Sequence, residues 1–392
     1  MPMQQSKVRL NFADGSAITS FISLKHVERF SDPLGLLEVS VRPPPEQYLD
    51  YRERLQKGEL VALLVDDKPQ ASMVIHTVRK VISSAEGTGI DITCHSPIIQ
   101  LFQSSPDPKS DRALKADAPL IDFVNEVVAP YGIGEVFAEK DTAAIKAKTG
   151  KGTNAADTPA KELKFAEARI QPNETAGSFL GRVITRLGVM MRMDPVGGGI
   201  YLTRPHYDQD PSYTVRCGPP GAGPAGDSFL DPIEVYDSNE QQHSFCEVVG
   251  EAVDKEDETS ANIPQARVES SEINPDRPPY RATGALAHKP LFYTDKDSRD
   301  AKKSRSTAFL ALGLKAETAF YVKGDTHGLV SREGTPWTID TTGRVYIHSD
   351  GFDEIMWLSQ RTWTLQKTRD GRGGQRTEHV WIPKGYLRLG EL

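Results

Sequence analysis

The sequence predicts a mainly β protein of the α+β class, with two β-barrel cores and smaller α/β insert domains. Apolar and polar residues alternate in the N-terminal part of the chain, which is typical of half-buried strands. Helical periodicity begins only after this part and precedes the final region. The final region alternates again and contains all the tryptophans, which we expect to anchor a second β core: Trp337, Trp357, Trp363 and Trp381.

The length of 392 residues is too great for one ordinary core, since domains usually contain about 100–200 residues. We expect an N-terminal β-barrel at residues 1–105 and a helix-bearing α/β insert at 106–217. A Gly/Pro-rich linker at 218–241 then leads to a C-terminal β-barrel at 242–392, with a helical insert at about 280–325.

The N-terminal barrel is predicted from strands that are separated by turn residues. Leu36–Val41 alternates apolar and polar side chains. Leu60–Val65 and Ala71–Ile82 flank Asp66–Pro69, whose residue types favour a reversal of the chain. Ile90–Cys94 adds a further strand. A barrel or a strongly curved sheet follows from this pattern.

The insert is predicted from a change to helical spacing. Apolar residues of Leu120–Val128 share one helix face, and those of Phe179–Leu187 share another. Val189–Met193 and Ile200–Thr203 flank a glycine run and predict a hairpin. Between the helices, residues 141–164 contain few large apolar side chains, so we expect a mobile loop.

The C-terminal half carries segments of opposite charge. Glu251–Pro279 is acidic and poor in apolar residues, and we interpret it as a long exposed loop. Ser298–Leu314 is predicted to be a helix. Its inward side chains are expected to be Phe309, Leu310 and Leu314. The clusters Lys289–Arg305 and Arg361–Arg376 are basic, and a solvated helix face and an exposed hairpin tip explain them. Because their charge is opposite to that of the acidic loop, we also hypothesise that they pair with it between subunits.

Composition excludes several classes of protein. The net charge of −7 argues against nonspecific binding to DNA or acidic membranes, which needs a basic face. No stretch approaches the roughly 20 apolar residues of a membrane helix. Met1–Lys7 lacks the apolar core of a signal peptide, so we expect synthesis in the cytosol. The cysteines are far apart and odd in number, which predicts reduced structural thiols: Cys94, Cys217 and Cys246.

The motifs in the sequence predict no catalytic, cofactor-binding or metal-binding residue. Gly226–Phe229 is similar to the Gly-Asp-Ser block of one esterase family, but no Asp-x-x-His companion follows it, which favours a turn. Gly150–Thr153 lacks the order of a phosphate loop. His76 and His348 are expected on strands as packed or solvated side chains. Asp254–Glu258 lacks the alternation of a calcium loop, so a solvated run is preferred.

One catalytic arrangement stays open at this point. A pair of carboxylates for glycoside hydrolysis is defined in space and not by sequence spacing. The sequence therefore leaves this chemistry undecided.

The order of the predicted elements resembles the Mu-type baseplate hub proteins of contractile phage tails, the late control D-like family. The strand at Gly58–Asp67, the strand-to-helix junction at Ile90–Leu101 and the helix and strand from Ala118 to Ile133 follow the pattern of the family. The most specific part runs from Glu174–Ala176 to Gly199–Arg204. The later matching segments are Lys289–Leu291, Ser298–Leu314 and Phe320–Gly324. At the junction, Cys94-His95 replaces the Gly-Arg that the family commonly has.

This resemblance implies a non-enzymatic structural protein. Hubs of the family are homotrimers whose subunits each carry two tube-type β-barrels, so that three subunits present six barrels in a ring. Such a ring joins the tail tube to the central spike and leaves a channel for DNA. The implied partners are a tail tube or distal tube protein, the central spike protein and the tape measure protein, without specific nucleic-acid binding or membrane insertion. The implied location is the tail baseplate of the virion, after assembly in the host cytoplasm.

Two other classes of function remain as alternatives. The first is a cell-wall hydrolase at the tail tip. The second is a receptor-binding or carbohydrate-binding β protein.

Overall fold

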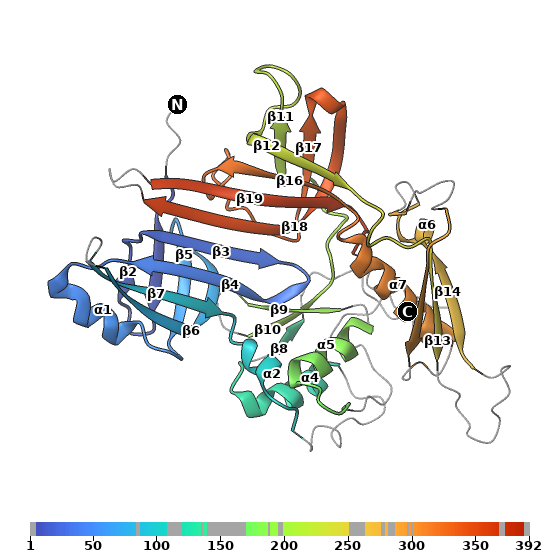
Figure 1. Cartoon of the computed structure of the whole chain (residues 1–392), viewed down its shortest axis with the longest axis horizontal. Helices are drawn as coiled ribbons and strands as arrows, with labels where there is room; N and C mark the ends of the chain where they lie inside the picture. The colour runs from blue at the N-terminus through green and yellow to red at the C-terminus, as the bar shows by residue number, and fades with distance from the viewer. Residues whose placement is uncertain are drawn as a thin grey trace.

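The computed structural model describes residues 5–83, 87–107, 120–134, 136–138, 170–186, 189–194, 199–250, 263–275, 279–280, 287–295, 298, 301–367 and 373–387. The predicted α+β, mainly β class is confirmed. One 13-stranded sheet runs through both β units, and two three-stranded sheets accompany it (Figure 1). Within these described ranges, no helix has the length and apolar content needed to cross a bilayer.

The N-terminal β unit is a curved sheet with the strand order β3-β4-β7-β6-β5-β1-β2 (blue to teal in Figure 1). Its elements are β1 (Val8–Phe12), β2 (Ala17–Ile18), β3 (Ser23–Arg29), β4 (Asp32–Val41), η1 (Pro45–Gln47), α1 (Tyr48–Arg54), β5 (Leu60–Val65), β6 (Lys68–Ser83) and β7 (Gly87–His95). Buried side chains alternate with half-buried ones along β1, as expected for a strand with one face on the core. That core contains Leu10, Leu63 and Ile90.

The turn between β5 and β6 is tighter than the sequence predicts. Asp66 and Asp67 both adopt left-handed conformations, with φ of 50° and 65°, which suits a two-residue hairpin turn. Lys68 and Pro69, which the pattern assigns to the turn, already belong to β6. A register shift beside them explains why a proline is tolerated in this strand.

The insert places helices against a small sheet. Its elements are α2 (Ile99–Gln103), α4 (Leu120–Val128), η2 (Ala129–Tyr131), β8 (Val136–Ala138), α5 (Ala176–Arg186), β9 (Met190–Met193) and β10 (Ile200–Thr203). β9 and β10 form the predicted hairpin. The apolar faces of α4 and α5 meet where Phe123 and Phe179 pack edge to face, with ring centroids 5.8 Å apart. The loop predicted at 141–164 lies outside the described residues.

The C-terminal β unit is a closed barrel in which pairing runs β17-β11-β12-β16-β19-β18 and returns to β17. Its strands are β11 (Tyr213–Cys217), β12 (Asp227–Asp237), β16 (Phe320–His327), β17 (Thr342–Ile347), β18 (Phe352–Lys367) and β19 (Gly373–Pro383), with η6 (His348–Asp350) before β18. The linker expected at 218–241 is therefore wrong in its second half. The Gly/Pro run ends at Gly226, and the aromatic and β-branched residues after it pair with β16.

A three-stranded sheet with the order β14-β13-β15 extends from the barrel. It comprises β13 (Phe245–Gly250), β14 (Gln265–Glu269) and β15 (Pro290–Asp295), next to α6 (Ser270–Ile273) and α7 (Ala301–Ala316). The expectation of an exposed loop over Glu251–Pro279 is wrong for β14 and α6. Val268 and Ile273 are buried there, so a few well-spaced apolar residues suffice for burial despite the acidic surroundings.

The helix predicted at Ser298–Leu314 is observed as α7, with one difference in its buried face. Phe309 and Leu312 face the core and Leu310 is half-buried, but Leu314 is 43% exposed. Leu314 lies five residues after Phe309, which turns its side chain well away from the face that Phe309 and Leu312 share.

Strand β18 joins the two β units. It pairs with β17 and β19 in the barrel and with β3 in the N-terminal sheet. Trp363 therefore packs in the N-terminal core, whereas the other three tryptophans lie in the barrel core. The expectation that all four anchor one C-terminal core is wrong for Trp363, because β18 is long enough to carry it across the junction.

Candidate functional site: a charged pocket between the two β units and the insert

The described part of the chain contains a pocket of ≈ 620 Å³ where the N-terminal sheet, the insert and the barrel meet. Strand β3 contributes His26 and Glu28, β9 contributes Arg192, and β18 contributes Arg361. The segment before β17 contributes Thr338. Each of the three parts of the fold thus supplies a charged or polar side chain to one space.

Arg361 is the most deeply buried charge in this pocket, with 2% of its surface exposed. Its Nη2 lies 2.7 Å from Glu28 Oε2, and its Nη1 donates a hydrogen bond to the Trp337 carbonyl. The guanidinium carbon lies 3.8 Å from the centre of the Trp363 ring, in a cation–π contact. Arg361 therefore binds the N-terminal sheet and the barrel at the same time.

Glu28 joins two cations. Arg192 Nη2 from the insert lies 2.9 Å from Glu28 Oε1, while Arg361 occupies the other oxygen. Burial alone raises the pKa of this carboxyl, but the charges of Arg361 and Arg192 outweigh burial and lower the pKa from 4.5 to about 2. Glu28 is therefore ionised at neutral pH, which makes it an anchor for cations and a poor general base.

Asp340 is a second carboxylate that gathers donors from different parts of the chain. It has a left-handed φ of 63°, and it accepts hydrogen bonds from the Trp357 indole at 3.0 Å and the His206 backbone N–H at 2.8 Å. His206 Nδ1 lies 2.6 Å from its other oxygen, and Arg192 Nη1 lies 3.8 Å from that oxygen. Arg192 thus bridges Glu28 and Asp340.

Two buried histidines complete the polar interior of the junction. Burial and the charge of Arg361 lower the pKa of His26 to about 4 and that of His379 to about 3. His379 contacts the Thr326 hydroxyl at 2.8 Å. Both rings are neutral at pH 7 and fill buried volume without adding charge. The arrangement is suited to fastening three parts of a fold together, because its carboxylates are already occupied by cations and donors.

The motif that resembled an esterase block is not part of this pocket. Asp227 begins β12, and its carboxylate accepts the Arg332 backbone N–H at 3.0 and 3.1 Å. Burial raises the pKa of Asp227, and the backbone hydrogen bond and the charge of Arg332 offset part of this increase. The segments Gly150–Thr153 and Asp254–Glu258 lie outside the described residues.

The remaining polar candidates are structural or surface groups. His76 is exposed on β6, as expected, whereas His348 lies in the 3-10 helix η6 and not on a strand, because the chain turns there at Gly351 with φ 61°. Cys94, Cys217 and Cys246 form no disulfide, and burial raises the pKa of Cys94 and Cys246 to about 12. Among the described residues, no group of three His, Cys, Asp or Glu side chains could hold a metal ion.

The sequence patterns did not point to Glu28, Arg192 or Asp340, and the expectation that Arg361 belongs to an exposed basic cluster is wrong, because its side chain is buried. The alternation along β18 contained the missing signal, since Arg361 is two residues from Trp363 and four from Leu365, on the same face. A charged residue on the apolar face of a strand indicates a buried partner. The identity of that partner depends on tertiary contacts, which no local pattern reveals.

Full-length similarity to solved structures is the decisive comparison. No protein-family profile matches the sequence, and no curated protein matches it. The tail protein from Neisseria meningitidis MC58 superposes with a TM-score of 0.73 and 14% identity, over 98% of this chain and 99% of that one. The chain has the fold of a phage tail protein.

Two further structures agree with this tail-protein fold. The 43 kDa tail protein of prophage MuSo2 from Shewanella oneidensis gives a TM-score of 0.71 and 16% identity, over 97% of this chain and 99% of that one. A chain of the Francisella PdpA-VgrG complex gives a TM-score of 0.54 and 9% identity, over 99% of this chain and 59% of that one. The resemblance to Mu-type hub proteins is thereby confirmed at the level of the fold.

Proposed function

We propose that this protein is the structural hub of a contractile phage tail baseplate. In this role it forms a homotrimeric ring that joins the tail tube to the central spike and leaves a channel for DNA. The observation that carries the proposal is the superposition on two tail proteins, one of them from a prophage, over nearly the whole of each chain. Such agreement includes both β units, the insert and the small sheet, and so extends well beyond one common domain.

The arrangement of the β units supports a ring. The curved N-terminal sheet and the closed barrel are held side by side by β18, which belongs to both. Three copies would therefore present six β units, which suits an adaptor between a six-fold tube and a three-fold spike. The pocket network supports the same role, because it fixes the angle between the units through buried charges such as Arg361 and Glu28.

Charge supports passage of DNA through the ring. Each chain has a net charge of −7, so a trimer would carry three times that charge. Acidic side chains on the wall of a channel would repel the phosphate backbone and prevent adhesion. We propose a tail tube protein and a central spike protein as partners at the two faces, with the tape measure protein as a further contact. The PdpA-VgrG likeness supports a partner of the spike type.

A non-enzymatic role is the proposal that fits the described polar residues best. Glu28 and Asp340 are bound by cations and hydrogen-bond donors, and Asp227 is bound by a backbone N–H. None of them is presented to a substrate as a free acid or base. Zymography of the purified protein on peptidoglycan tests the alternative of a tail-tip hydrolase, and a clear band of lysis would contradict the structural role.

The direct experiment is native mass spectrometry of the purified protein, alone and with co-expressed tube and spike proteins. We expect a trimer, and a larger complex once the partners are present. Electron microscopy of phage particles that lack the gene should show tubes without baseplates. A monomer that joins neither partner, together with normal tails in the deletion, would overturn the proposal.

A further inference from the structure

Strand β6 is longer than the sheet that supports it. β5 pairs with β6 only from Lys68 to Val74, and the backbone of Ile75 bonds to Gly58 and Glu59. From Thr77 to Ser83, β6 pairs with β7 on one side. Its other edge has no strand partner among the described residues. The β6–β7 hairpin therefore leaves the sheet as a two-stranded arm.

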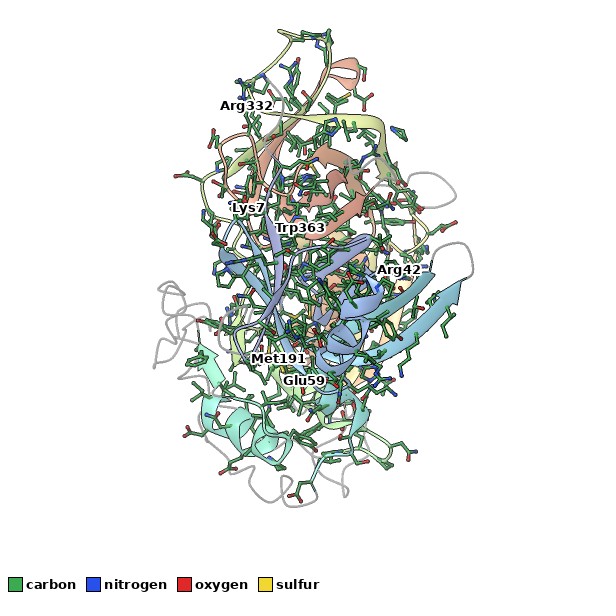
Figure 2. All side chains as sticks on the ribbon, turned by 90° about the vertical axis from the view of Figure 1, so that its left-hand side faces the viewer. Lys7, Arg42, Glu59, Met191, Arg332 and Trp363 are labelled. Carbon is green, nitrogen blue, oxygen red and sulfur yellow. The ribbon has the colours of Figure 1, made fainter. Side chains whose placement is uncertain are left out.

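This arm exposes features that soluble proteins normally cover. Ile82 near its end is 84% exposed, and Lys80 on the same side of the strand is exposed as well. Figure 2 shows the hairpin projecting from the body beside Arg42. A two-stranded ribbon is marginally stable alone, and a free edge with exposed apolar residues is a template for another strand.

The base of the arm is held rigidly. Asp91 on β7 binds Arg42 at 3.0 Å, Arg79 at 3.0 Å and the Ser40 hydroxyl at 2.7 Å. Burial raises the pKa of Asp91, but these hydrogen bonds outweigh burial and lower the pKa overall. An ionised Asp91 between two arginines fixes the direction in which the arm leaves the sheet. A preset direction reduces the entropy lost when such an arm binds.

A second free edge lies on the other β unit. β12 pairs with β11 only at Asp227 and Ser228, whereas its pairing with β16 continues to Asp237. Beyond a register shift around Pro232, the stretch Glu234–Asp237 has no strand partner on its outer side in the described part of the chain. Val235 is 40% exposed there, and Glu234 and Asp237 are exposed and acidic.

We propose that the β6–β7 arm of one copy pairs, antiparallel, with the β12 edge of a second copy. One register satisfies both ends of the contact. If Ile82 lies opposite Val235, then Lys80 lies opposite Asp237, because both pairs are separated by two residues on their strands. The contact then sets an apolar residue against an apolar one and a cation against an anion.

The geometry of the molecule requires that the two edges meet between copies. Figure 1 shows the arm and β12 on different β units, at opposite sides of the molecule. A contact between two different patches is heterologous, and it closes into a ring when the rotation between copies fits. This inference rests on the proposed ring and names the strands that build it. Main-chain hydrogen bonds would supply affinity, and Lys80 and Asp237 would select the register.

Charge exchange tests the register. Lys80→Asp or Asp237→Lys alone places like charges opposite each other and should raise the concentration at which the trimer dissociates by on the order of tenfold. The double variant K80D/D237K restores opposite charges and should restore the trimer. Lys302→Asp makes the same charge change on the exposed face of α7 and should leave the trimer unchanged. Circular dichroism verifies that each variant is folded.

Cysteine cross-linking tests proximity independently. In a Cys217→Ser background, Ile82→Cys with Val235→Cys should form intermolecular disulfides that accumulate as a covalent trimer. Ile82→Cys with Ile355→Cys is the matched control, since Ile355 is 45% exposed but lies outside the β12 edge. Cross-linking in the control at the same rate would overturn the proposal.

The outcomes separate this inference from the hub proposal. A wild-type trimer that K80D leaves intact and that I82C/V235C does not cross-link would overturn the strand pairing while the hub role stands. A wild-type protein that stays monomeric even with tube and spike proteins would overturn both. A K80D variant that forms a normal trimer but no longer joins tails would assign the arm to another tail protein and would also overturn the pairing.

Discussion

Gln375 on β19 binds the backbone of Ser6 through both ends of its side-chain amide. Nε2 donates to the Ser6 carbonyl at 2.7 Å, and Oε1 accepts the Ser6 N–H at 2.9 Å. The amide thus imitates the donor and acceptor of a neighbouring strand. It links the start of the N-terminal sheet to the barrel across 369 positions of sequence.

Gln375→Ala removes both hydrogen bonds and should lower the free energy of unfolding by about 1–2 kcal/mol, since the site is partly buried. Gln375→Glu should cost as much, because a carboxylate cannot donate to the Ser6 carbonyl. Urea unfolding with an unchanged m value measures both effects. Gln70→Ala is the control, because the Gln70 side chain makes a local, exposed hydrogen bond to the Lys68 carbonyl and its removal should cost little stability. Equal losses in Gln70→Ala and Gln375→Ala would argue against the link.

Arg361→Met should be among the most destabilising substitutions of a charged residue in the chain. It leaves Glu28 next to Arg192 alone and removes the hydrogen bond to Trp337, so we expect a loss of about 3–5 kcal/mol. Arg344→Met breaks the solvent-exposed pair with Asp353 and should destabilise the protein far less than Arg361→Met, because water screens an exposed pair.

The double variant E28Q/R361M separates pairing from burial. It removes both partners of the ion pair. Its loss of unfolding free energy should be smaller than the sum of the losses in the two single variants, because each single variant leaves one charge of the pair without its partner and the double variant does not. Additive losses in guanidinium unfolding would show that Arg361 acts mainly through its packing on Trp363.

Local patterns predicted the elements better than the way the elements meet. The apolar run Leu60–Val65 before turn residues predicts a strand that the structure contains, and the glycine run before Ile200 predicts a hairpin that it also contains. These signals depend on neighbours in sequence. The closure of the barrel depends on β12, whose strand residues follow directly after a Gly/Pro run and were grouped with it.

The candidate site was beyond local prediction for a physical reason. Glu28, Arg192, Asp340 and Arg361 come from four separate segments, and the first three look like ordinary surface charges in their own surroundings. Burial and pairing appear only when β18 crosses from the barrel to the N-terminal sheet. Only Arg361 could have been recognised as buried from its neighbours in sequence, because it shares one face of its strand with Trp363.

Acid should destabilise the protein through its buried histidines. Burial, reinforced by the charge of Arg361, lowers the pKa of His26 from 6.5 to about 4 and that of His379 to about 3. Below pH 6.5 the unfolded chain therefore takes up protons that the folded chain does not bind. Their contribution to stability is complete above pH 6.5 and decreases as the pH falls, by up to about 1.4 kcal/mol per pH unit for each histidine.

Guanidinium unfolding at several pH values between 8 and 5, a range above the ordinary pKa of Glu28, measures this slope. His379→Gln cannot titrate and should show a shallower decline, whatever its stability at pH 8. His76→Gln, at an exposed position of β6, is the control for exchanging a histidine for glutamine. If unfolding free energy declined equally with falling pH in His379→Gln and the wild type, the conclusion that His379 is buried in its neutral form would be wrong.

Trp363 should determine how firmly the N-terminal sheet is held to the barrel. Its ring packs in the N-terminal core against His26, with centroids 5.7 Å apart, although its backbone belongs to β18. Trp363→Ala should cost about 3–5 kcal/mol through the cavity that it leaves. Hydrogen exchange should show early loss of protection in β3 and β4, because these strands lie on the side of β18 that Trp363 supports. Trp337→Ala, in the barrel core, should instead cause β11 and β17 to lose protection first. If the strands lost protection in the same order in both variants, the two cores would open as one unit.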